Sequence, residues 1–89
     1  MLVQPFKYYH QYGTKIEEMH FNGRSQIQIA VLLDIGIRNT KIVMALLGIA
    51  EDSRAEELIR KNIPEANWLG TIDHGLRAIL GEPTGIVYV

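Results

Sequence analysis

Stacking is the first chemistry that the sequence offers, because aromatic residues lie beside positive charge near the N-terminus. The segment PFKYYHQYG, residues 5–13, contains Phe6, Tyr8, Tyr9 and Tyr12. Aromatic rings next to basic side chains stack on nucleobases, and the same rings pack onto a core or a partner protein. We expect packing and subunit contact here, and we add Trp68 as a further contact residue because tryptophan concentrates binding energy at interfaces.

A weaker hypothesis keeps the stacking function of these rings. A pocket between two subunits would bind a nucleotide-like ligand, with Tyr8, Tyr9 or Tyr12 against the base and Arg24 on the phosphate. This hypothesis requires the tyrosines and Arg24 to lie close together in the assembly.

Residue types that carry catalysis or hold metals form no working pattern in the sequence. The chain has no cysteine, which excludes thiolate chemistry and cysteine-based metal sites. His10, His20 and His74 lack the i, i+4 spacing of a zinc-binding pair. P-loop, dinucleotide and G-x-S-x-G motifs are also missing from the sequence. We therefore predict a non-enzymatic protein with no cofactor and no metal.

A second chemistry, the binding of DNA, is suggested by residues 39–61, NTKIVMALLGIAEDSRAEELIRK. This stretch resembles the helix-turn-helix family in the apolar positions Val43, Leu47 and Ile49 and in the turn glycine Gly48. The resemblance covers about a quarter of the chain and implies a first helix, a tight turn and a recognition helix.

Two residues depart from that pattern. Met44 occupies a position where the family prefers a small residue, and Arg54 falls where the recognition helix should turn an apolar side chain inwards. One extra residue in the turn would bring Ala55 and Leu58 into the core instead. Four acidic residues between 51 and 57 would also repel a DNA backbone. The candidate contacts to DNA or another anion are Arg24, Arg38, Lys41, Ser53, Arg54, Arg60 and Lys61.

Size and composition limit the remaining classes. A chain of 89 residues, 47% hydrophobic and 21% charged, is typical of one folded domain, residues 1–89. The formal net charge of −1 is less positive than a broad nucleic-acid footprint requires. The most apolar run, residues 42–50, is far shorter than the roughly 20 residues of a membrane span. The N-terminus lacks the pattern of a signal peptide, so we expect a cytoplasmic protein without membrane contact.

Helix-start patterns divide the chain into elements. Three pairs match the capping box, in which a hydroxyl residue is followed three places later by Glu or Gln: Thr14 with Glu17, Ser25 with Gln28, and Ser53 with Glu56. Gly23, Gly36 and Gly81 stand where left-handed terminating residues are wanted. These positions predict helices at about 15–22, 26–35, 40–48, 53–63 and 72–80.

The apolar spacing predicts which helix faces are buried. Ile27, Ala30, Val31 and Asp34 form one such face, whose far end we expect at the surface because it is a carboxylate. Ala55, Leu58, Ile59 and Ile63 form another. An alternative for residues 15–33 is a hairpin about FNGR, but its pairing leaves neither face cleanly apolar. The β-branched tail GIVYV, residues 85–89, predicts a short strand, paired with residues 2–9 or with another subunit.

Together these patterns predict a mainly α protein, a compact bundle of about five short helices with an extended N-terminal segment and a short C-terminal strand. The function we expect is that of a small binding or regulatory protein that acts through protein–protein contacts and forms a homo-oligomer. The alternative from another class is a helix-turn-helix DNA-binding regulator that uses residues 39–61.

Overall fold

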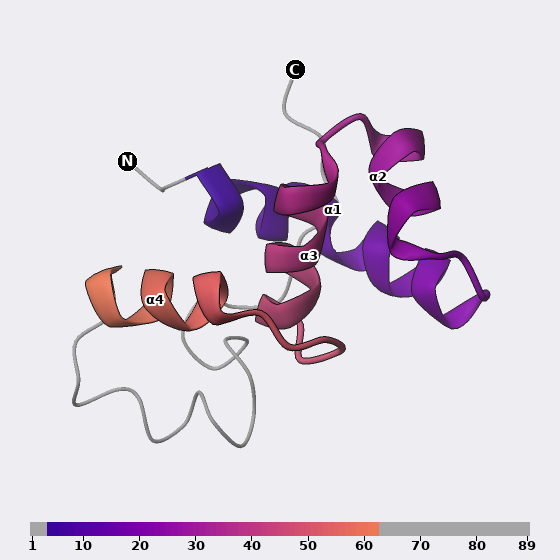
Figure 1. Ribbon diagram of the computed structural model, residues 1–89. Coiled ribbons are helices and arrows are strands. Elements are labelled where there is room, and N and C mark those ends of the chain that lie inside the picture. Colours follow the sequence, from indigo (N-terminus) through magenta and orange to yellow (C-terminus); the bar gives the residue numbers. More distant parts are fainter. Residues whose placement is uncertain (1–3, 63–89) are drawn as a thin grey trace.

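The computed structural model describes residues 4–62, and these form four helices and no strand (Figure 1). The helices are α1 (Gln4–Phe21), α2 (Gln26–Leu33), α3 (Ile37–Leu46) and α4 (Ser53–Asn62). The mainly α prediction is therefore confirmed for this part of the chain. The helix predicted at 72–80 and the strand predicted at 85–89 lie outside the described residues, as does Trp68.

Helix α3 organises the described part of the chain, because it contacts the other three helices (Figure 1). Four of its ten residues, Ile42, Val43, Met44 and Leu46, are buried apolar side chains. The buried Thr40 is accommodated because its hydroxyl donates a hydrogen bond of 2.9 Å to the carbonyl of Gly36. The core consists of these residues and of apolar side chains that the other helices turn towards α3.

The N-terminal segment is helical, so the prediction of an extended segment was wrong. Helix α1 starts at Gln4, and Thr14 lies inside it instead of at its start. The buried residues Phe6, Tyr9, Gly13 and Ile16 recur at spacings of three, four and three, which places them on one helical stripe. This stripe packs towards α3 and holds the aromatic segment in place.

The turn between α1 and α2 rules out the hairpin alternative. Gly23 has a φ of +87°, its amide donates to the carbonyl of His20, and the amide of Arg24 donates to the carbonyl of Met19, each at 3.0 Å. This pair of bonds is the Schellman motif that ends a helix. The predicted terminating role of Gly23 is confirmed, and residues 15–33 are helical apart from this turn and its cap.

Capping explains where α2 and α4 begin. Ser25 and Gln28 form the predicted capping box. The amide of Ser25 donates to the side-chain oxygen of Gln28 at 2.9 Å, and the amide of Gln28 donates to the hydroxyl of Ser25 at 3.1 Å. At α4, however, the carboxylate of Asp52 accepts the amide of Arg54 at 2.9 Å. Asp52 therefore caps α4, in place of the predicted Ser53.

Helix α2 ends at a different residue from the one expected. The left-handed residue after α2 is Asp34, with a φ of +54°, whereas Gly36, with a φ of +81°, stands at the N-cap of α3. Aspartate tolerates the left-handed region better than most side chains. The short connection between α2 and α3 therefore needs Asp34 and Gly36 together.

Candidate interaction surface

The aromatic segment is divided between the core and the edge of the core. Phe6 and Tyr9 are 4% and 0% exposed, so they belong to the core. They do not form the partner-binding surface that was predicted for them. Tyr8 and Tyr12 are half-buried, with ring centroids 5.9 Å apart, and the hydroxyl of Tyr8 accepts a hydrogen bond from Gln4 at 2.9 Å. These two rings pack against the core cluster and leave only their outer edges accessible.

The outer face of α2 holds three of the five large hydrophobic side chains that are exposed among residues 4–62. We use this name for Ile27, Val31 and Leu32, whose side chains are 69%, 73% and 56% exposed. Ile27 and Val31 are one helical turn apart and are therefore neighbours. Figure 1 shows α2 at the edge of the molecule, with α3 and α1 on one side and no other described helix on its far side. Large aliphatic side chains gathered in this way are characteristic of interaction sites.

The opposite face of α2 anchors the helix. Ile29 and Ala30 are buried, and Leu33 is half-buried against the core cluster. The predicted buried face was therefore wrong for Ile27 and Val31, whereas Ala30 is buried and the end at Asp34 is exposed, as predicted. Helix α2, QIQIAVLL, is apolar at six of eight positions, so periodicity alone does not select one face. A signal was present nonetheless, because a helix that is apolar all round has more apolar surface than one core contact covers.

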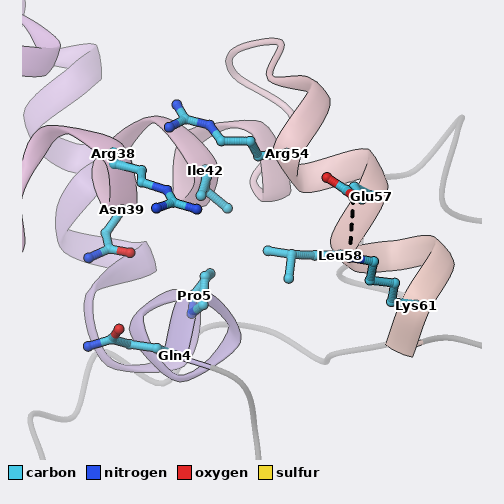
Figure 2. Close-up of a pocket in the computed structure, with 9 residues that line it drawn as sticks. All are labelled: Gln4, Pro5, Arg38, Asn39, Ile42, Arg54, Glu57, Leu58 and Lys61. Carbon is cyan, nitrogen blue, oxygen red and sulfur yellow. Dashed lines mark ion pairs between the residues drawn. The ribbon is translucent and has the colours of Figure 1, made fainter.

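A second feature is a hollow between α1, α3 and α4, which we call the basic hollow. Arg38 of α3 and Arg54 and Lys61 of α4 line it, together with Pro5 and Leu58. Figure 2 shows the side chains of Arg38 and Arg54 extending towards each other from opposite sides. The structure thus brings together three of the predicted anion contacts.

Two of the three cations in the basic hollow already have anionic partners. Asp52 accepts two hydrogen bonds from the Arg54 guanidinium, at 2.9 Å from Nε and 2.8 Å from Nη2. Glu57 pairs with Lys61 at 3.2 Å (Figure 2). Within residues 4–62, Arg38 makes no ion pair, which leaves it as the cation most available to an anion.

The Asp52–Arg54 pair also sets the protonation of the cap. Hydrogen bonds from the Arg54 side chain lower the pKa of Asp52 from 3.8 to about 2. Desolvation acts in the opposite direction and raises this pKa, while the positive charge of Lys41 contributes a smaller lowering. The carboxylate is 11% exposed and the guanidinium 38%. This geometry is a side-on pair in which one carboxylate holds both a side chain and the first turn of α4.

The remaining predicted DNA contacts lie apart from the basic hollow or beside it. Lys41, Ser53 and Arg60 are exposed and do not line it, and Arg24 belongs to the turn between α1 and α2. Ala55 is buried and Leu58 half-buried, as the adjusted helix-turn-helix alignment predicted. Residues 47–52 join α3 to α4, however, and this connection is longer than the three or four residues of a helix-turn-helix turn.

The residues of the nucleotide hypothesis lie far apart within one chain. Tyr8 and the last residue of α1, Phe21, are separated by about 20 Å along the helix axis at 1.5 Å per residue. Arg24 follows that end of the helix, and Tyr9 is fully buried. The tyrosines and Arg24 of one chain therefore do not form a single ligand site.

Comparison with protein-family models, curated proteins and solved structures finds no match to this chain. Among the described residues, no three His, Asp or Glu side chains are grouped in a way that could hold a metal ion. No helix within residues 4–62 has both the length and the apolar character needed to cross a membrane. The outer face of α2 and the basic hollow are therefore the two surfaces that bear on function.

Proposed function

We propose that this protein is a small non-enzymatic binding protein that acts through protein–protein contacts, with the outer face of α2 as its docking surface. The observation that carries this proposal is the exposure of Ile27, Val31 and Leu32 on a helix whose other face is already anchored in the core. Covering these side chains removes aliphatic surface from water, at roughly 25 cal/mol per Å².

The geometry of α2 suits such a role. Its capping box and its contacts with α3 hold the helix in one orientation before any partner arrives. A preformed helix face loses little conformational entropy on binding, which leaves more of the burial energy for affinity. Exposed aliphatic residues on a rigid helix dock into a groove or against another helix.

Site-specific photo-crosslinking tests this proposal in living cells. A photoreactive amino acid at position 31 should give discrete protein adducts, whereas the same group at position 60, on the charged surface of α4, should give few. Adding Ile27→Glu to the position-31 protein should remove the adducts, because a carboxylate is costly to bury in an apolar contact. If position 31 gives no more adducts than position 60, the outer face of α2 is not a docking surface.

A second candidate function is DNA binding through α3 and α4, supported by the convergence of Arg38, Arg54 and Lys61 on the basic hollow. It predicts a mobility shift with duplex DNA at low salt that weakens steeply as salt rises. Arg38→Ala should weaken the shift more than Arg54→Ala, because Arg54 is held by Asp52. Arg24→Ala serves as the remote control, and an absent shift at low salt would remove this candidate.

A further inference from the structure

Residues of opposite charge flank α2 in the chain. Arg24 precedes the N-cap of α2, and Asp34 is its C-cap. Both residues are exposed, and neither side chain forms an ion pair with a described residue. Along the chain, a cation and an anion therefore flank the aliphatic pair, and Arg24 lines a hollow with Glu18 of α1 and Leu32 of α2.

These charges stand at the wrong ends for α2 itself. A helix N-terminus favours acidic side chains and its C-terminus favours basic ones, yet the first turn of α2 has no acidic residue and its last turn no basic one. Asp34 supplies the left-handed conformation, but asparagine would do so without the charge. The charge pattern is thus not explained by the dipole of α2, although Arg24 also follows the C-terminus of α1 and Asp34 precedes the N-terminus of α3, where each charge is favourable.

The positions are symmetric about residue 29. Ile27 and Val31 lie two residues before and after it, and Arg24 and Asp34 lie five residues before and after it. If a second α2 packs antiparallel about a twofold axis at this level, Ile27 faces Val31 of the partner subunit, and Arg24 faces Asp34 of the partner subunit. Each contact then occurs twice, as an isologous interface requires.

We propose that the occupant of the outer face of α2 is a second copy of this chain, with the two α2 helices antiparallel. This inference rests on the proposed function and names the partner. Antiparallel packing places the negative end of each helix dipole beside the positive end of the other, so charges that are unfavourable in one α2 become favourable in the pair. Because α2 spans only two helical turns, the dimer is a weak, concentration-dependent one.

Sedimentation of the full chain over a wide concentration range measures this association. The wild type should convert from monomer to dimer as concentration rises, and Val31→Glu should abolish the dimer. Arg24→Glu should weaken it roughly tenfold at low salt, because two attractive pairs become repulsive. Arg60→Glu, a matched charge reversal on α4, should leave the dimer unchanged. A wild type that remains monomeric throughout would overturn the proposal.

Loss of folding does not mimic these results. Arg24→Glu places an acidic residue near the N-terminus of α2, where it is favourable, and near the C-terminus of α1, where it is unfavourable, so the dilute monomer should unfold at nearly the same temperature as wild type. Circular dichroism of dilute samples checks this. A variant that unfolds at low concentration and dimerises less would indicate a structural role for Arg24 and overturn the charge pairing.

Mixing two variants tests the antiparallel register. Arg24→Glu and Asp34→Arg should each dimerise poorly alone, yet a one-to-one mixture should form heterodimers of near wild-type affinity, since every facing pair is again of opposite charge. Asp34→Asn keeps the left-handed residue and should weaken the dimer only a few-fold. A mixture that associates no better than its components would overturn the register.

The two proposals fail separately. If the wild type is monomeric while a photoreactive residue at position 31 captures a different protein, the second-copy proposal falls and the docking surface stands. If position 31 captures neither this chain nor another protein, both fall. Adducts of twice the chain mass that become fewer with Arg24→Glu support both.

Discussion

Helices α2 and α4 are both short, and both pack on α3, yet they have opposite outer surfaces. Helix α4 carries five charged residues in ten and buries Ala55, with Leu58 and Ile59 partly buried beside it. Helix α2 carries no charged residue in eight and exposes three aliphatic side chains. The apolar residues of α4 are those that its core contact uses, whereas α2 has more apolar residues than its core contact uses.

This difference separates folding from binding. Helices of eight or ten residues are unstable alone in water, so both must gain their stability from packing on α3. The apolar stripe of α4 is fully accounted for by that packing. The outer face of α2 contributes nothing to it, which leaves this surface available for the contact that we propose.

The largest expected effect contrasts the two faces of α2. Ile29→Ala should reduce the free energy of unfolding by about 3 kcal/mol, because the side chain is fully buried and leaves a cavity. Val31→Ala should change it by less than about 0.5 kcal/mol in dilute samples, where no partner is bound. Urea denaturation at low protein concentration measures both.

The control for this pair is Ile29→Val, which removes one methylene and should cost about 1 kcal/mol. A Val31→Ala protein as unstable as Ile29→Ala at high dilution would show that the outer face is covered within the chain. The contrast between α2 and α4 would then disappear.

Local signals in the sequence predicted several elements well. The Ser25–Gln28 box fixed the start of α2, and Gly23 fixed the end of α1, because caps depend on residues adjacent in sequence. The face of α4 that packs on the core was also predicted for Ala55, Leu58 and Ile59, since few apolar residues leave one choice of face, while Ile63 lies outside the described residues. These features need no knowledge of the rest of the chain.

Tertiary packing decided what the sequence could not. Phe6 and Tyr8 alternate with Lys7 and Tyr9, as the residues of an extended segment do. The helical stripe that forms instead includes Gly13, which carries no apolar signal. In α2 nearly every position is apolar, so only α3 determines which side is buried. The candidate site was missed for this reason, since Ile27 and Val31 were assigned to the core.

The cap of α4 provides the smaller expected effect. Asp52→Ala should lower the free energy of unfolding by about 1 kcal/mol, because it removes the bond to the amide of Arg54 and releases the guanidinium. Asp52→Asn keeps a capping oxygen and should cost less. Thermal unfolding of dilute samples measures both, and equal losses for Ala and Asn would mean that the charge matters more than the cap.

Acid should weaken α4 while leaving the cap of α2 intact. The folded-state pKa of Asp52, about 2, lies below its usual 3.8, so its stabilising contribution is complete above about pH 3.8 and is lost as the pH falls through 2. The cap of α2 is the hydroxyl of Ser25, which does not titrate in this range. Amide hydrogen exchange between pH 4 and 2, after correction for the intrinsic rate, should therefore show protection falling in the first turn of α4 and not in that of α2. Asp52→Asn should remove this difference. If both helices lose protection together in that variant, their common support on α3, and not the cap, controls their opening.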